Sequence, residues 1–172
     1  REKGTNRTLY KLGKVDKYSW IMAGSSFLPS DMNAAYLYAQ LEIADQINDT
    51  RMDHWNRYYR ALEPMKEAGL IELPTVPEYC VHNAHMFYIK AKDFEERAGL
   101  ISYLRGHDIL PASHYIPLHS SAAGLRYSTF HGEDRYTTKE SERLLRLPMY
   151  YSLTNDDLDE VVQRVKEYYH FS

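Results

Sequence analysis

One helical pattern covers residues 31–62 and is too long for the core of a small domain. Its apolar residues, which recur at steps of three and four, are Met32, Ala35, Ala39, Ile43, Ile47, Met52, Trp55, Tyr59 and Leu62. This spacing places them on one face of a helix, and Ser30 or Asp31 can cap its first turn. We therefore expect a linking helix over 31–66, about 45 Å long, that bridges two parts of a larger structure or bends near 48–49.

After an irregular stretch at 1–30 and this helix, the chain alternates short strands and helices. Aromatic and β-branched residues mark the strands, and apolar spacing of three and four after a capping side chain marks the helices. The predicted strands are 70–73, 85–90 and 109–118, and the predicted helices are one capped by Asp93, one over 133–147 and one capped by Thr154. The expected fold class is α+β, a small and mainly antiparallel sheet packed by helices.

Composition indicates a globular chain. Its 172 residues are 44% hydrophobic and 26% charged, which suits a folded core rather than disorder. A net charge of −3 without a block of Lys and Arg predicts no nucleic-acid partner, and no apolar run approaches the ~20 residues of a membrane span. The single cysteine, Cys80, forms no internal disulfide and fits a reducing compartment, so we expect a cytoplasmic protein.

The run from His114 to His119 is the first candidate site. It places two imidazoles and the phenol of Tyr115 within six residues, and Pro117 stiffens the backbone between them. Imidazoles donate and accept protons and hydrogen bonds near neutral pH. An ordinary edge strand also tolerates such residues, so the run by itself leaves both interpretations open.

A metal site is an alternative use of the histidines. His82 and His85 could join His114 and His119 in a tetrahedral site. A three-residue step along a strand, however, points side chains to opposite faces, and no carboxylate or cysteine stands at ligand spacing. We therefore expect no metal.

Ser25 and Ser26 form a second candidate site. They follow Gly24 and precede the start of the long helix, where free amides and hydroxyls bind anions. The segment lacks the Gly-x-Ser-x-Gly elbow of a hydrolase nucleophile. A phosphate contact and a simple turn with a cap both fit these residues.

Five segments in order resemble the C-terminal part of the sugar-nucleotide aminotransferases, which are PLP enzymes of fold type I. The segments are 1–4 (REKG), 24–35 (GSSFLPSDMNAA), 85–88 (HMFY), 114–119 (HYIPLH) and 141–148 (SERLLRLP), followed by an amphipathic helix. The resemblance covers essentially the whole chain. It implies the small domain of such an enzyme at 67–172, the linking helix at 31–66, and a segment at 1–30 that continues from an N-terminal PLP-binding domain.

The resemblance also implies a reaction and partners. An amino group passes from L-glutamate, through PLP, to C4 of dTDP-4-dehydro-6-deoxy-D-glucose, in a homodimer whose subunits share each active site. The Schiff-base lysine of such enzymes belongs to the N-terminal domain, and no lysine of this chain stands in a matching motif. The first residue is Arg1. We therefore expect a part of a longer protein that is inactive alone.

Individual roles carry over only where residues match. Ser26 stands where the family has an Asn that reaches the PLP phosphate of the partner subunit, beside Ser25, and Leu28 replaces an Arg. The resemblance implies that His119 lies beside the sugar nucleotide, flanked by Tyr115 and His114. Two alternatives remain: a non-catalytic nucleotide-sugar binding or dimerisation module, and a related sugar aminotransferase or dehydratase for another nucleotide sugar.

Overall fold

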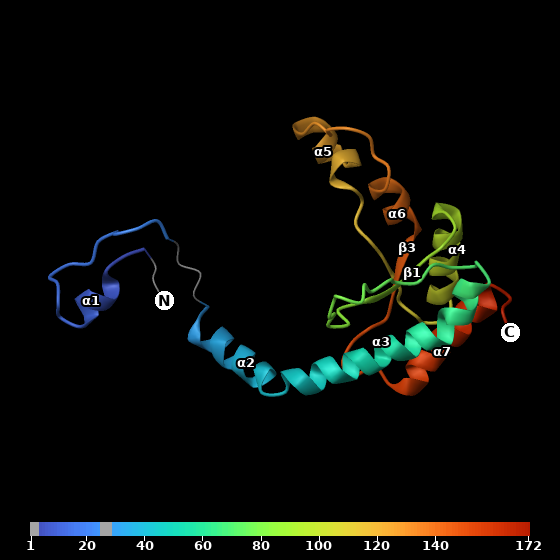
Figure 1. The fold of residues 1–172 in the computed structure, drawn as a ribbon, viewed down its shortest axis with the longest axis horizontal. Coiled ribbons are helices and arrows are strands. Elements are labelled where there is room, and N and C mark those ends of the chain that lie inside the picture. The colour runs from blue at the N-terminus through green and yellow to red at the C-terminus, as the bar shows by residue number, and fades with distance from the viewer. Residues whose placement is uncertain (1–3, 25–28) are drawn as a thin grey trace. The chain divides into compact units, whose positions relative to one another are not determined.

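The computed structural model describes residues 4–24 and 29–172, which form two compact units, Arg1–Ala44 and Asp45–Ser172 (Figure 1). In the first unit, a β-bridge between Thr5 and Trp20 closes a loop, and this loop contains the short helix α1 (Arg7–Lys11). Gly4 sits at this closure with φ of 79°, and a Cβ there would approach Met22 O to 2.5 Å. Glycine is therefore required at this position.

The predicted helix over 31–66 forms as two helices, α2 (Asp31–Leu41) and α3 (Ala44–Glu67), so the alternative of an uninterrupted helix was wrong. Ser30 caps α2 as predicted, accepting from Asn33 N at 3.2 Å. The interruption falls at 42–43 and not near 48–49. At this point the amide of Ile43 donates to Gln40 O at 3.3 Å. No described residue of α2 is buried, so no core packing holds the helix continuous across this turn.

The second unit contains a three-stranded antiparallel sheet in the order β1-β3-β2. The strands are β1 (Phe87–Lys90), β2 (Ala112–Ser113) and β3 (Leu144–Leu147). Phe87 faces Leu147 and Ile89 faces Leu145 across the β1–β3 ladder, and all four side chains are buried. Alternate residues of a strand point to opposite faces, so these two pairs form the apolar face of the sheet.

Helices α3, α4 (Phe94–Arg105) and α7 (Asn155–Tyr168) supply the other half of the core (Figure 1). The fully buried side chains that they contribute are Tyr58, Leu62, Met65, Leu100, Leu104, Leu158 and Val165. The predicted caps form: Asp93 accepts from Glu96 N at 2.9 Å, and Thr154 and Asp157 make a reciprocal capping box. The predicted α+β class, a small antiparallel sheet packed by helices, is confirmed.

Three of the predicted element boundaries were wrong. The helix expected over 133–147 is the shorter α6 (Thr137–Arg143), and Leu144–Leu147 is instead the central strand. The strand expected at 109–118 is reduced to Ala112–Ser113, and the one at 70–73 to a single bridge between Glu72 and Lys90. A segment of only four residues has a weak local preference for helix or strand. Pairing with β1 and β2 on both edges therefore decides the conformation of β3.

The chain between β2 and β3, called the excursion below, leaves the sheet and forms η1 (Leu118–Ser120), α5 (Ala122–Tyr127) and α6 (Figure 1). Ser121 caps α5 by accepting from Gly124 N at 3.0 Å. A Cβ at Gly124 would lie 1.7 Å from Leu118 O, so only glycine allows η1 and α5 to approach this closely. This excursion carries His119.

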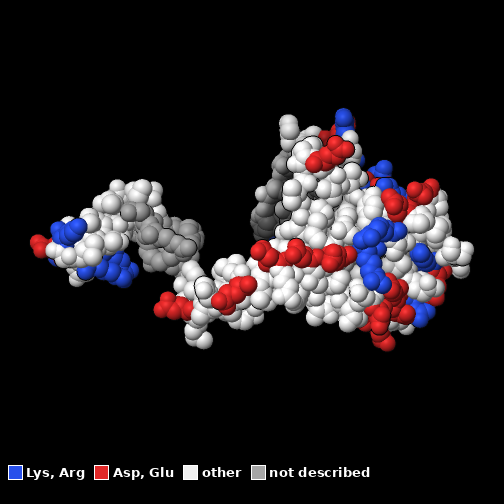
Figure 2. All heavy atoms as spheres, turned by 60° about the horizontal axis from the view of Figure 1, so that its bottom comes forward, with Lys and Arg blue, Asp and Glu red and all other residues white. Residues whose placement is uncertain are grey.

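The drawn face of the second unit carries acidic and basic side chains next to one another (Figure 2). Arg57 of α3 pairs with Asp159 of α7, and Arg164 pairs with Glu160 at 2.7 Å and with Glu167 at 2.8 Å. Within 4–24 and 29–172, no helix combines the length and the apolar character needed to cross a membrane.

Candidate functional site

The imidazole of His119 is held on two sides. Its Nε2 lies 2.8 Å from Oδ2 of Asp134, and its ring packs against Phe130 with centroids 4.4 Å apart. The side chain keeps 20% of its surface exposed, so it is ordered by its neighbours and still accessible to a ligand. Asp134 lies fifteen positions further along the chain, on the segment that leads into α6.

Asp134 is itself fixed by Thr138. The Thr138 hydroxyl donates to Oδ2 at 2.5 Å, and the Thr138 amide donates to the same oxygen at 3.2 Å. These two bonds, with a smaller contribution from His119, lower the pKa of Asp134 below its usual value. The carboxylate therefore stays charged at neutral pH.

The other predicted site residues are placed differently. Tyr115 is 80% exposed and His114 is also exposed, with their rings 5.5 Å apart in an edge-to-face contact. Among the described residues, no hydrogen bond joins this pair to His119. Ser25 and Ser26 lie outside the described residues.

Three residues of this site were not predicted from the sequence: Phe130, Asp134 and Thr138. Asp134 lies two residues before Tyr136, the N-cap of α6, and accepts from the amide of Thr138 four residues on. The predicted start at Glu133 placed Asp134 inside the helix, whereas α6 begins at Thr137. The contact with His119 is a tertiary one, for which the sequence gives no local signal.

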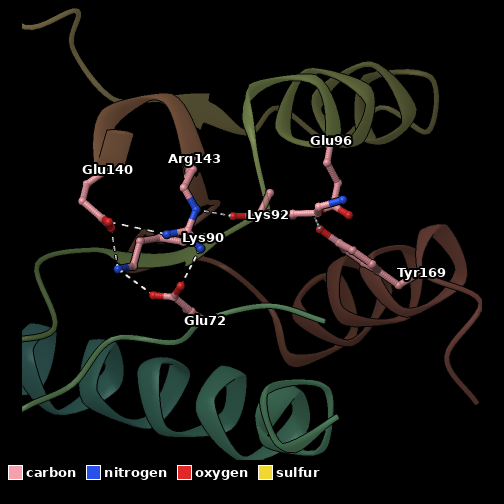
Figure 3. Close-up of polar contacts among 8 residues, drawn as sticks. Glu72, Lys90, Lys92, Glu96, Glu140, Arg143 and Tyr169 are labelled. Carbon is pink, nitrogen blue, oxygen red and sulfur yellow. Dashed lines mark hydrogen bonds and ion pairs between the residues drawn. The ribbon is translucent and has the colours of Figure 1, made fainter. Parts of the chain in front are cut away.

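A network of charges lies beside this excursion, at the edge of the sheet (Figure 3). Nζ of Lys90 lies 2.8 Å from Glu72 and 2.7 Å from Glu140, and Arg143 lies 2.5 Å from Glu72. Lys90 and then Arg143 lower the pKa of Glu72. Burial opposes the charge of Lys90, but its bonds to Glu140 and Glu72 outweigh this effect and raise the pKa of Lys90.

Near the start of β1, the side chain of His82 and the backbone of His85 have structural partners. The His82 ring packs on Trp55 with centroids 4.6 Å apart, and its Nδ1 accepts from Ala84 N at 3.3 Å. Arg51 donates to the carbonyl oxygens of Ala84 and His85, which fixes the chain entering β1. In the part of the chain that the structure describes, no three His, Cys, Asp or Glu residues cluster as a metal site would require.

The described lysines do not fit the covalent attachment of PLP. Such attachment needs an unpaired amine inside an enclosed site. The exposed lysines are Lys11, Lys14, Lys17, Lys66, Lys92 and Lys139. Lys90 is neutralised by Glu72 and Glu140, and Lys166 lies half-buried on α7. Among the described lysines, none therefore combines an unpaired amine with an enclosed site in this structure.

The fold is that of the PLP-dependent aminotransferases. DesV of S. venezuelae, solved in complex with a ketimine intermediate, superposes with a TM-score of 0.76 at 27% identity, over 94% of this chain and 42% of that chain. A model of the DegT/DnrJ/EryC1/StrS aminotransferase family matches residues 2–166. The chain belongs to this family of sugar aminotransferases.

Two relatives are named as transaminases of dTDP-sugars. A dTDP-3-amino-3,4,6-trideoxy-alpha-D-glucose transaminase of Micromonospora megalomicea subsp. nigra is 31% identical over 64% of this chain and 29% of its own length. A dTDP-3-amino-3,6-dideoxy-alpha-D-galactopyranose transaminase of Aneurinibacillus thermoaerophilus is 28% identical over 93% of this chain and 42% of its own length. The chain thus spans well under half the length of either relative.

Proposed function

We propose that this chain is the C-terminal part of a dTDP-4-amino-4,6-dideoxygalactose transaminase. The enzyme moves an amino group from L-glutamate to C4 of dTDP-4-dehydro-6-deoxy-D-glucose and forms dTDP-4-amino-4,6-dideoxy-D-galactose for the polysaccharide enterobacterial common antigen. The family match over residues 2–166 carries this proposal. The dTDP-sugar names of two relatives support the nucleotide, and the resemblance of residues 24–35 and 114–119 supports the choice of sugar.

In this proposal, residues of this chain bind and orient the sugar nucleotide and the cofactor phosphate. His119, flanked by Tyr115 and His114, contacts the sugar nucleotide. Ser25 and Ser26 contact the phosphate of PLP held by the partner subunit. A keto sugar needs hydrogen bonds that present one face to the reacting amine, and fixed side chains supply them at low entropic cost. The ordered, accessible imidazole of His119 supports its assignment.

The catalytic lysine belongs, in this proposal, to an N-terminal PLP-binding domain of a longer protein. Residues 1–30 continue from that domain, 31–66 link it, and 67–172 form the small domain. The absence of a fitting lysine among the described residues supports this division, as does the greater length of the relatives. This chain by itself is then inactive in transamination.

A homodimer is part of the proposal, and the composition of α2 supports it. Its large apolar side chains are exposed in this chain: Met32, Tyr36, Leu37, Tyr38 and Leu41. So many exposed apolar side chains are seldom left in contact with water, and the N-terminal domain and the partner subunit together would cover them.

We place the enzyme in the cytoplasm, where its single cysteine, Cys80, stays reduced.

The test is an assay of the longer protein with L-glutamate and either dTDP-4-dehydro-6-deoxy-D-glucose or a UDP-linked keto sugar. We expect turnover of the dTDP-sugar, with NMR of the product showing the amino group at C4 in the galacto configuration. Faster use of the UDP-sugar, or amination at C3, would assign a different sugar aminotransferase. A purified dimer that binds dTDP-sugars without turnover and without the absorption of lysine-bound PLP would identify a binding module instead.

A further inference from the structure

Helix α6 is fixed to the body of the second unit by its C-terminal half. Arg143, its last residue, donates from Nε to Ala91 O at 2.8 Å and pairs with Glu72 at 2.5 Å. Glu140, one turn earlier, lies 2.7 Å from Nζ of Lys90 on β1 (Figure 3). Each of these contacts joins α6 to residues distant in sequence, so the helix has a defined place relative to the sheet.

The N-terminal half of α6 passes this order on to His119. Thr138 donates its hydroxyl and its amide to Asp134, and the carboxylate of Asp134 faces Nε2 of His119 at 2.8 Å. The ring of Phe130 packs on the imidazole at an interplanar angle of 35° and restricts its rotation. The orientation of His119 is therefore set by residues that follow it in sequence.

We propose that Asp134 is a positioning residue for His119: it holds the Nε2–H, so that Nδ1 accepts a hydrogen bond from a hydroxyl of the substrate's sugar. This inference rests on the proposed contact between His119 and the nucleotide sugar. It adds which ring nitrogen meets the ligand, which chemical group it meets, and which residue sets the orientation.

The chemistry of the two partners selects this arrangement. A carboxylate with a lowered pKa only accepts hydrogen bonds, so the nitrogen that faces Asp134 must carry the hydrogen. When the imidazole is neutral, its lone pair lies at Nδ1, which then accepts from a hydroxyl and cannot donate to a phosphate oxygen. Carboxylates orient functional histidines in this way at many sites.

The test compares Asp134→Ala and Asp134→Asn with the unchanged aminotransferase that contains this chain. Calorimetry measures binding of dTDP-4-dehydro-6-deoxy-D-glucose and of dTDP, and steady-state kinetics gives KM and kcat. For Asp134→Ala we expect the dissociation constant and KM of the sugar nucleotide to rise about tenfold, with kcat within about threefold. Binding of dTDP should not change, because dTDP lacks the hexose and therefore the hydroxyl that Nδ1 contacts.

Asp134→Asn and a neighbouring acid separate positioning from other effects. Asn keeps an oxygen that accepts from Nε2–H, so it should restore most of the affinity lost in Asp134→Ala. Glu133 is 79% exposed and pairs only with Arg135 among the described residues, so Glu133→Ala should bind like the unchanged protein. Equal loss of dTDP and dTDP-sugar binding in Asp134→Ala, or no loss of either, overturns the proposal.

Nitrogen-15 NMR of the histidine side chains, with His119→Asn used for assignment, gives a readout independent of turnover. We expect the Nε2–H tautomer of His119 in the unchanged protein and a mixture of tautomers in Asp134→Ala. The Nδ1–H tautomer in the unchanged protein overturns the proposal. If the unchanged protein binds no dTDP-sugar but the tautomer depends on Asp134, the proposed function and the sugar contact fail, while the orientation of His119 by Asp134 is confirmed.

Discussion

Nζ of Lys90 lies 2.7 Å from Oε2 of Glu140, which ties strand β1 to a helix fifty positions further along the chain. Glu72 lies on the other side of the same amine at 2.8 Å and also reaches Arg143. The three ion pairs join the bridge at Glu72, the edge strand and α6. This network fixes the end of the excursion that carries His119.

Glu72→Gln removes the charge that both Lys90 and Arg143 face, and we expect it to destabilise the protein at neutral pH. Because the folded-state pKa of Glu72 is lowered from 4.5, its contribution is complete above that value and is lost as the pH falls through the lowered pKa. Urea unfolding at pH 7 and pH 3 should show a difference between variant and unchanged protein only at pH 7. Glu78→Gln, which removes an exposed charge outside the network, is the control.

Leu145→Ala should destabilise the protein by about 2–5 kcal/mol, because Leu145 is fully buried at the centre of β3 and its truncation leaves a cavity. Leu144→Ala is the matched control, since Leu144 lies on the other face of the same strand and is only half-buried. Guanidinium unfolding measures both. Equal effects of the two substitutions would contradict the assignment of Leu144–Leu147 as a strand.

Gly124→Ala should disrupt the contact between η1 and α5, because the added Cβ would lie 1.7 Å from Leu118 O. We expect a cost of about 1–3 kcal/mol, typical of overpacking, and faster hydrogen exchange over 118–127. Gly106→Ala is the comparison, since its Cβ would approach no atom closer than 3.3 Å. Unchanged exchange over 118–127 in Gly124→Ala would show that this close approach does not form.

Thr154→Ala should cost about 1 kcal/mol, because it removes the oxygen that accepts from Asp157 N at 3.1 Å at the start of α7. Thr154→Ser keeps that oxygen and should retain most of the stability. Thermal unfolding of the two variants distinguishes loss of the cap from loss of the methyl group. A Ser variant as unstable as the Ala variant would contradict the capping role.

Local signals predicted the starts of three helices, α2, α4 and α7. Ser30, Asp93 and Thr154 cap the helices that the sequence indicated, because a side-chain oxygen satisfies amides only two or three residues away. The strand expected at 85–90 forms as β1 at Phe87–Lys90. The order of short segments also identified the family, to which residues 2–166 match.

Distant contacts decided the rest. The interruption at 42–43 and the strand conformation of Leu144–Leu147 depend on packing and pairing that a short apolar pattern does not encode. The sequence by itself determined the family, and it indicated His119 as a candidate contact. Only the tertiary structure brought Asp134, Thr138 and Phe130 to that imidazole, because a contact between separate segments has no periodicity along the chain.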